Sequence, residues 1–548
     1  MILSAFLLYL ASLHMAGNFG RYHDDTLYFS SAQALAQGRR YIMPSVPGNP
    51  PQGKYPILYS WLLSWIWKWQ PSFPANVSAA VWMTAGFACW FLIAAFQMLR
   101  RLAGFGNGTA LALTALCAFQ PHFVFLSGSV LSDMPFMALA LTAALVADGA
   151  FRPTSPPGLA LVAGILAGLS VMTRGAGLAV VAAIAAAALC RRAYRRAAVF
   201  CLAAAPFLLS GFLLRAAPDP ALQKWAAMGG PGFRQTWAFY TGYWGFWRLS
   251  VPDWPALRLL LAANIHELLE TPASLCLFPP LGDGSYVGVL LGYTLSTGIL
   301  AGLARQARRQ EWKPVHFLFP FYAALVVMQV QAQMDRYLLL FLPLFYGGLW
   351  IEGRHFVSLL LSTVRASRPA GEKALAGVLS LSVLVLGGLA ADHYVRGFRP
   401  QLREQSAERA TLSSEQQQLY DWIRHNTDPQ SRFVAYEDVN LYLHTGRQAM
   451  RPIEFSGAAF LSGNDAALES GLAHITDVAE HIGASYWVVT PQDFIVLTNR
   501  APLEKRLAQV RSAFPVVFRS RDHQLQVLDL SCLQHPGRSE CHVAALNP

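Results

Sequence analysis

The stretch RYHDDTLY, residues 21–28, places two adjacent carboxylates, Asp24 and Asp25, directly after an apolar segment over residues 1–19. Adjacent like charges repel each other, and a low-dielectric boundary beside them raises the cost of ionisation. One interpretation is a helix start, because early acidic residues favour the helix dipole. The other interpretation is a functional site at the exit of a membrane span. The residues elsewhere in the chain distinguish between the two.

The composition is that of a polytopic membrane protein. Hydrophobic residues make up 54% of the 548 residues and charged residues only 13%, whereas soluble globular chains carry about 25% charged residues. The net charge is +11, but most of the excess lies in short loops between apolar segments. That pattern concerns orientation in a membrane, so we do not expect nucleic acid as a partner.

Apolar segments that approach the roughly 20 residues needed to cross a bilayer recur along the chain. The eleven candidates are 1–19, 78–99, 109–127, 133–150, 158–173, 175–190, 197–215, 286–304, 315–332, 336–352 and 374–391. Segments 158–173 and 175–190 are short, so this region is either a broken pair or one long helix. The first segment lacks a basic n-region and an obvious cleavage site, which favours a retained span over a signal peptide.

Basic residues test this count, because cytoplasmic loops are enriched in Lys and Arg. They follow every second segment: Arg100, Arg101, Arg152, Arg191, Arg192, Arg195, Arg196, Arg305, Arg308, Arg309, Lys313, Arg354, Arg365, Arg368 and Lys373. If eleven spans alternate, all of these lie on the cytoplasmic side, together with the N-terminus. Loops 20–77 and 216–285 and everything after about residue 392 then lie outside.

The outer loops carry helical and aromatic patterns. Residues 26–38 read as an amphipathic helix, and residues 57–69 are apolar with four tryptophans, a composition typical of the membrane–water interface. The loop 216–285 is also rich in Trp and Tyr, which suits the interface or stacking on a sugar or lipid.

From about residue 393 charged and polar residues return, and the pattern predicts a small α/β domain. The expected helices are 414–425 and 503–514, and the expected strands are 432–436, 486–490, 516–519 and 524–528. Cys532 and Cys541 could form a disulfide in an oxidising compartment. The sequence thus predicts an all-α transmembrane domain over 1–392 and an extracytoplasmic α/β domain over 393–548.

Four charged features fall at the predicted outer edge of the spans. They are Asp24-Asp25, Lys54 in GKYPILYSW (53–61), Asp133 in SDMP (132–135) and Arg336-Tyr337 in DRY (335–337). Each also has a plain structural interpretation: Asp133 fits a helix cap, Lys54 a solvated lysine and Arg336 a helix start. Taken together, carboxylates that supply a base or metal ligands and cations that bind phosphate suggest group transfer from a lipid phosphate.

The order of these features resembles the GT-C class of polyprenyl-phosphate-sugar-dependent glycosyltransferases. It is most similar to the branch with protein O-mannosyltransferases and lipid A aminoarabinose transferases. The matching residues are Asp24-Asp25, Lys54 to Trp61, Asp133, and Arg336-Tyr337 with Pro343. The likeness covers about residues 1–352. The chain departs from the family pattern in its Asp-Asp pair and in Tyr55, which stands where proline is common.

The resemblance implies sugar transfer, with inversion, from a polyprenyl-phosphate-sugar donor to a hydroxyl on a protein, lipid or glycan acceptor. Asp24 would be the general base, and Asp25 would orient the acceptor. Lys54 and Arg336, with Tyr59 and Tyr337, would bind the donor and its phosphate. Asp133 would bind the acceptor or, with Asp24, a divalent ion (Mg²⁺, Mn²⁺ or Zn²⁺), since metal use varies across the class. The expected location is the bacterial inner (plasma) membrane, with the C-terminal domain periplasmic or extracellular.

Two other functions stay open at this point. A multispan transporter would place ionisable residues near mid-membrane, and Arg174 in MTRG (172–175) is the candidate. An O-antigen ligase or polymerase would use arginines of the large outer loop. Those are Arg234, Arg248 and Arg258.

Overall fold

The computed structural model describes residues 2–12, 19–101, 103–213, 219–277, 286–309, 312–330, 333–363, 414–455, 465–491 and 497–534, with isolated residues at 373–396, 459, 493 and 494. The chain forms two compact units, described separately below. Unit 1 contains residues 1–15, 81–210 and 261–405, and unit 2 contains residues 16–80, 211–260 and 406–548. Unit 2 therefore gathers most of the three stretches predicted to lie outside, whereas the predicted boundary near residue 392 stays a prediction.

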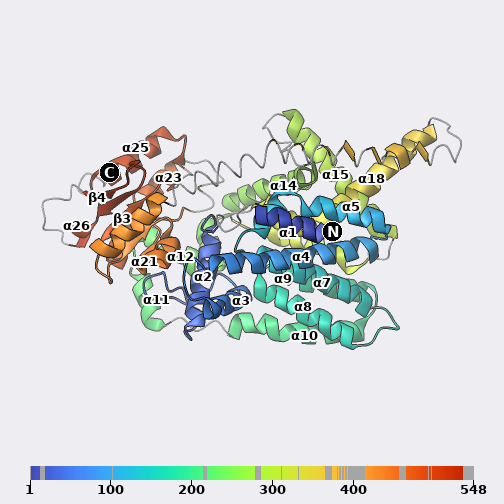
Figure 1. Cartoon of the computed structure of the whole chain (residues 1–548), viewed down its shortest axis with the longest axis horizontal. Coiled ribbons are helices and arrows are strands. Elements are labelled where there is room, and N and C mark those ends of the chain that lie inside the picture. Colours follow the sequence, from blue (N-terminus) through green and yellow to red (C-terminus); the bar gives the residue numbers. More distant parts are fainter. Residues whose placement is uncertain are drawn as a thin grey trace. The chain divides into compact units, whose positions relative to one another are not determined.

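Unit 1 is built from helices, several of which run side by side (Figure 1). They are α1 (Ile2–Ser12), α4 (Val77–Arg101), α5 (Asn107–Ala118), α6 (Pro121–Ser127), α7 (Asp133–Ala150), α8 (Gly158–Thr173), α9 (Gly177–Cys190), α10 (Tyr194–Leu213), α14 (Trp254–Leu277), α15 (Tyr286–Arg309), α16 (Pro314–Val326), α17 (Met334–Tyr337), η2 (Leu338–Phe341) and α18 (Leu342–Thr363). Helix α4 begins in unit 2, and so does α14.

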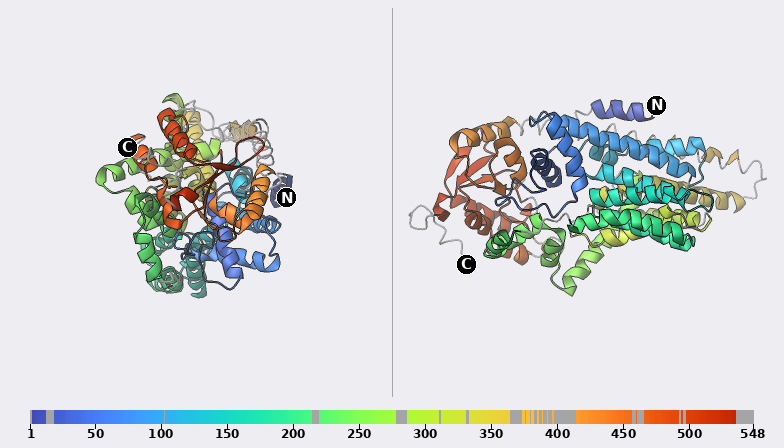
Figure 2. Two further views of the ribbon diagram at one scale, coloured as in Figure 1. Left: turned by 90° about the vertical axis from the view of Figure 1, so that its left-hand side faces the viewer. Right: turned by 90° about the horizontal axis from the view of Figure 1, so that it is seen from below.

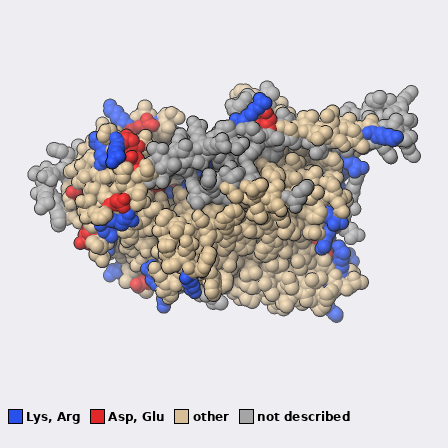
Figure 3. All heavy atoms as spheres, in the orientation of Figure 1, with Lys and Arg blue, Asp and Glu red and all other residues tan. Residues whose placement is uncertain are grey.

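Several of the basic loops of unit 1 lie against one another. Arg191 donates to Asp148 at 2.9 Å, the Arg196 guanidinium donates to Ser155 O at 2.9 Å, and Lys313 Nζ donates to Arg101 O at 3.3 Å. The helical surface visible in Figure 3 is largely free of charged side chains, and its Lys and Arg gather toward the right-hand end of that view. This separation of apolar flank from basic end is the one that a membrane domain requires.

Length and composition support membrane spans but not their predicted number. Among the described residues, three helices pass as candidate spans, or four if α5 and α6, bent by 66°, count as one. Helices α8 and α9 have 16 and 14 residues, shorter than a full span of roughly 20. They are two separate helices rather than one long one. The count of eleven spans stays a prediction.

Helix α14 was not foreseen, because its sequence lies in the stretch taken as an outer loop. Its 24 residues include Arg258, Glu267 and Glu270, which lower its average hydropathy below that of a span. It is anchored within unit 1, where Asn264 Nδ2 donates to the backbone oxygens of Val327 and Gln329, each at 2.8 Å.

Unit 2 combines helices with one mixed sheet. Its elements are α2 (His23–Ala36), α3 (Ile57–Trp69), α11 (Pro220–Ala227), α12 (Pro231–Thr241), α13 (Tyr243–Ser250), β1 (Phe433–Ala435), α21 (Asp438–Thr445), β2 (Ala449–Met450), α23 (Asp465–Leu472), α24 (Asp477–Ile482), β3 (Tyr486–Val489), α25 (Ala501–Ser512), β4 (Val516–Arg519), β5 (Gln526–Asp529) and α26 (Ser531–Gln534). Helix α2, dark blue in the right-hand view of Figure 2, packs against the orange α21.

The strand order is β2-β1-β3-β5-β4. Strand β1 pairs in parallel with β2 and β3, and β5 pairs antiparallel with β3 and β4. The four predicted strands and the two predicted helices, the latter found at 414–426 and in α25, are confirmed. The helices predicted at 26–38 and 57–69 are confirmed as α2 and α3. The Cys532–Cys541 disulfide stays a prediction, because Cys541 lies outside the described residues.

Candidate active site

The acidic pair lies in the first turn of α2, and its N-cap residue, Tyr22, makes no side-chain capping hydrogen bond. Asp25 is fully buried, and its Oδ2 accepts a hydrogen bond from the Gly20 N–H at 3.1 Å. Burial, with a smaller contribution from Asp24, raises the pKa of Asp25 well above its usual value. A buried carboxyl group that is bonded to the backbone suits a residue that fixes the turn.

Asp24 is only partly buried, and it accepts a hydrogen bond from the hydroxyl of Tyr55. The Tyr55 ring packs against Tyr28 with 4.6 Å between centroids, and Tyr28 meets Tyr59 edge-on at 5.2 Å. Tyr55, the departure from the family pattern, is thus the residue that orients Asp24. Tyr59 is fully buried in unit 2, and its predicted contact with substrate stays a prediction.

Lys54 is buried beside aromatic rings rather than solvated. Its Nζ lies 3.5 Å from the centroid of Phe239 and 5.7 Å from that of Tyr243, which are cation–π distances. The preceding Gly53 permits this approach, because a Cβ there would lie 2.3 Å from the backbone oxygen of Thr241. The plain interpretation of Lys54 as a solvated lysine is therefore wrong, since it is 9% exposed.

The ionisation of Lys54 predicts a pH effect. Burial and, to a smaller extent, Arg451 lower the pKa of Lys54 from 10.5 to about 8, although Asp24, Glu454 and Asp438 oppose the shift. Lys54 is thus charged below about pH 8 and loses its charge as the pH rises through that value. If its charge binds a phosphate, we expect the KM for a phosphate-bearing donor to rise above about pH 8, measured as steady-state kinetics across the range.

The control for this prediction is Lys54→Arg, because a guanidinium stays charged over the whole range. The variant is expected to show a KM that does not change across about pH 8. The same rise in both proteins would assign the titration to another group and remove Lys54 from phosphate binding.

A second charged cluster lies in unit 1. The Arg336 guanidinium donates to both oxygens of Asp133, with Nε at 3.1 Å from each and Nη2 at 2.7 Å from Oδ2. Arg174, between α8 and α9, also donates to Asp133, and its guanidinium lies 4.9 Å from the Tyr337 ring centroid. Two arginines share one carboxylate here, so these three ionised groups carry one net positive charge.

This cluster explains the charges that the sequence left ambiguous. Asp133 is the first residue of α7 and makes bonds to arginines of other segments, which a simple cap would not. The Asp335 carboxylate lies 3.1 Å from the His122 ring. Both of these side chains are about half exposed. The sequence had given no role to His122.

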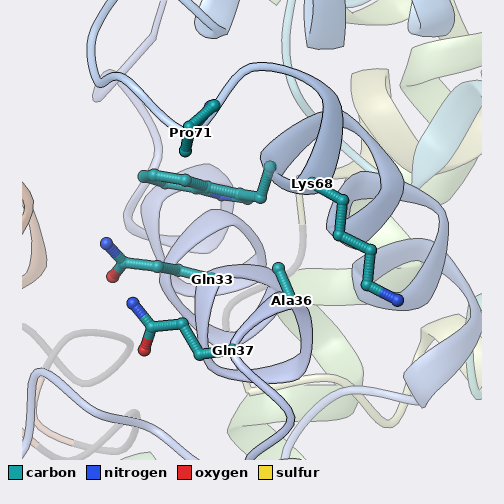
Figure 4. A pocket seen from close by; sticks show the side chains of 6 residues that line it. Gln33, Ala36, Gln37, Lys68 and Pro71 are labelled. Carbon is teal, nitrogen blue, oxygen red and sulfur yellow. The ribbon is translucent and has the colours of Figure 1, made fainter.

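A pocket of about 340 Å³ opens at the C-terminal ends of α2 and α3, away from the acidic pair (Figure 4). It is lined by Gln33, Ala36, Gln37, Trp67, Lys68 and Pro71. The side chains of Gln33 and Gln37 extend in the same direction, away from Lys68. None of the predicted site residues lines this pocket.

Solved structures of membrane glycosyltransferases share this fold. ArnT from Cupriavidus metallidurans, bound to undecaprenyl phosphate, aligns with a TM-score of 0.52 and 14% identity over 97% of this chain and 98% of its own. The oligosaccharyltransferase AglB from Archaeoglobus fulgidus, in complex with an inhibitory peptide and a dolichol-phosphate, aligns with a TM-score of 0.50 and 14% identity. That alignment covers 92% of this chain and 70% of AglB.

The chain has the GT-C fold. The resemblance stated from the sequence is thereby confirmed at the level of the fold. No family model matches the sequence, and neither does any curated protein. At 14% identity the likeness does not carry the donor, acceptor or catalytic residues of either enzyme to this GT-C chain.

Sequence reasoning gave no functional role to five polar residues of unit 2 that are linked by hydrogen bonds and an ion pair. They are His23, Tyr240, Asp438, Arg451 and Glu454. His23 adjoins Asp24, and its position next to the acidic pair was the one available signal. The others come from segments hundreds of positions away, so local periodicity gave no indication of them.

The predicted metal site does not fit Asp133. Both of its oxygens accept hydrogen bonds from arginines, and two guanidinium groups beside a carboxylate oppose a cation. In the described part of the chain, no cluster of three or more His, Cys, Asp or Glu side chains could hold a metal ion. The prediction that Asp133 is a metal ligand is therefore wrong for this arrangement of side chains.

Proposed function

We propose that the protein is an integral-membrane glycosyltransferase that moves a sugar from a polyprenyl-phosphate-sugar donor to an acceptor hydroxyl. The observation that carries the proposal is the arrangement of Asp24 and Lys54 in one unit of a GT-C fold. Asp24 is a carboxylate held by Tyr55, and Lys54 is a buried cation beside Phe239. A base and a phosphate-binding cation are the two groups that such a transfer needs.

In the proposed reaction Asp24 takes the proton of the acceptor hydroxyl. The hydroxyl oxygen attacks the anomeric carbon and forms the new glycosidic bond, while the bond from that carbon to the phosphate oxygen breaks. The configuration is inverted because the attack and the departure occur on opposite faces. Polyprenyl phosphate leaves with the electron pair, and Lys54 stabilises its charge.

The two clusters give the predicted residues distinct roles. The net positive charge around Arg336 and Arg174 suits a phosphate, and Asp133 holds Arg336 in a fixed orientation. Tyr337, beside Arg174, forms one wall of that cluster. Asp25 stabilises the turn that carries Asp24. Tyr59 packs against Tyr28, which in turn packs against the Tyr55 that holds Asp24. Undecaprenyl phosphate in ArnT and dolichol-phosphate in AglB are consistent with a lipid phosphate here.

We place the protein in a bacterial inner membrane, with the N-terminus in the cytoplasm and the C-terminal domain outside. This rests on the alternation of basic loops in the sequence and on the contacts that several of them make in unit 1. Donor, acceptor and surrounding lipids are the proposed partners. The acceptor is a protein, lipid or glycan hydroxyl.

The alternative functions gain little from the structure. Arg174, the transporter candidate, is paired with Asp133 and packs over Tyr337. The three loop arginines that a ligase would use are all exposed and form no buried site: Arg234, Arg248 and Arg258.

The test is transfer of labelled sugar by the purified full-length protein in lipid nanodiscs. Polyprenyl-phosphate-sugar is offered with candidate acceptors, and both labelled product and released polyprenyl phosphate are measured. We expect both to accumulate in equal amounts, and a nucleotide-sugar donor to give neither. Donor that remains intact with every acceptor class would contradict the proposal. A parallel assay with the protein in sealed vesicles tests the transporter function, and sugar that crosses the vesicle membrane unchanged would also contradict the proposal.

A further inference from the structure

Asp438, the first residue of α21, is a fully buried carboxylate that the reaction above does not use. One of its oxygens lies 2.9 Å from His23 Nε2. The other accepts a hydrogen bond from the Tyr240 hydroxyl at 2.5 Å. These three residues come from α21, α2 and α12, and all belong to unit 2.

A plain explanation is that Asp438 favours the dipole of α21, as an acidic residue in a first turn does. The hydrogen bonds argue against this as its main role, because both oxygens bond to side chains of other segments. A buried carboxylate is costly unless it is well paired. Here Asp438 is paired with His23 and Tyr240, and each of these residues is adjacent in sequence to a residue of the proposed site.

Those neighbouring residues are the proposed base and the ring beside the proposed phosphate-binding cation. His23 directly precedes Asp24, and Tyr240 directly follows Phe239, whose ring centroid lies 3.5 Å from Lys54 Nζ. The Tyr240 hydroxyl also accepts a hydrogen bond from the Arg451 N–H at 3.1 Å, which ties α12 to the C-terminal segment a second time.

The start of α2 is held by this contact as well as by the hydrogen bond from the Gly20 N–H to Asp25. We propose that Asp438 is a positioning residue that sets Asp24 through His23 and Lys54 through Tyr240. The C-terminal domain then contributes a positioning residue to the proposed transfer site. This inference rests on the roles proposed above for Asp24 and Lys54.

The contact also shows that His23 must supply a hydrogen-bond donor at Nε2. Its Nε2 donates to Asp438, and its Nδ1 is buried with no hydrogen-bond partner among the described residues. His23 then acts as a neutral donor, consistent with its pKa, which burial lowers. A glutamine amide can replace a donor at the position of Nε2, whereas an alanine cannot.

The experiment measures kcat for transfer by the full-length protein. Asp438→Asn and His23→Ala are expected to lower kcat by about 100-fold, the scale of a 1 Å misplacement of a catalytic group. The kcat of His23→Gln is expected to stay within about threefold of wild type, the scale of a substitution that keeps the interactions of the original side chain. The matched control is Asp477→Asn, since Asp477 also joins the C-terminal segment to α12, through the Gly232 N–H at 2.9 Å.

Two further results separate positioning from a general loss of structure. Asp438→Asn should reduce kcat by a smaller factor in an Asp24→Asn background than in the wild type, because the part of its effect that acts through Asp24 is already lost there. Additive losses would overturn the inference, as would equal effects of Asp438→Asn and Asp477→Asn. A His23→Gln variant as impaired as His23→Ala would also overturn it, since it would show that the imidazole itself is required.

The outcomes remain informative if one variant fails to fold. Should Asp438→Asn not accumulate, the comparison of His23→Gln with His23→Ala tests the same contact. Wild-type protein that transfers no sugar from any polyprenyl-phosphate donor would instead refute the proposed function. That result differs from failure of the inference, in which the wild type is active and the contact variants stay active.

Discussion

Asp24→Asn is expected to lower kcat for sugar transfer by about 100-fold or more, the usual scale of a lost general base. Asparagine keeps the size of the side chain and can still accept the hydrogen bond from Tyr55, but it cannot take a proton. Donor binding should change little, because the phosphate is assigned to cations elsewhere. The measurement is a rate of labelled product formation at saturating donor, together with a donor-binding isotherm.

The matched control is Asp25→Asn, one residue further along the same turn. Asp25 is fully buried, and asparagine has nearly the same size and shape as the side chain that it replaces. Its backbone contact to Gly20 can be kept by the asparagine oxygen. We expect most activity to survive. An Asp24→Asn protein as active as wild type would remove Asp24 from the chemistry, and a larger loss in Asp25→Asn would move the base to that residue.

Asp133→Asn is expected to destabilise the protein by about 3–5 kcal/mol, the scale for removing one partner of a buried ion pair. The side chains of Arg336 and Arg174 are 6% and 16% exposed, so the change leaves two arginines with little solvent to replace the carboxylate. The rate of sugar transfer should fall as well, because Arg336 loses the bidentate contact with Asp133 that orients it. Thermal unfolding in a mild detergent measures the first effect.

Asp148→Asn provides the comparison on the same helix, since Asp148 also pairs with two arginines. Arg152 is 63% exposed, and Arg191 is 19% exposed. Solvent can take over at least one of these contacts, and exposed pairs contribute about 0–1 kcal/mol. The expected order of melting temperatures is wild type, then Asp148→Asn, then Asp133→Asn. Equal melting temperatures for the two variants would contradict the role given to the Asp133 cluster.

Parts of the fold follow from the sequence because they depend on local patterns. The apolar runs indicated a membrane protein, and the return of polar residues near 393 indicated the α/β part. Helix α3 and strands β3, β4 and β5 were predicted to within a few residues, since periodicity is a property of neighbouring positions. Helix α14 escaped this approach because its charged residues break an otherwise apolar run.

The candidate site divides in the same way. The order of Asp24, Lys54, Asp133 and Arg336 along the chain was enough to indicate a lipid-phosphate chemistry. It was not enough to show that Arg174 and Arg336 share Asp133 or that Tyr55 holds Asp24. Those contacts depend on which side chains face one another after packing.

The contact between His23 and Asp438 is the clearest case, because 415 positions separate the two residues. Each looks like an ordinary polar residue near a helix start when the sequence is considered alone. Burial in one unit makes them partners, since a carboxylate removed from water must find donors wherever the fold supplies them. The sequence by itself determined the class of protein and its charged motifs, and the tertiary structure decided which of those charges are paired, buried and held in place.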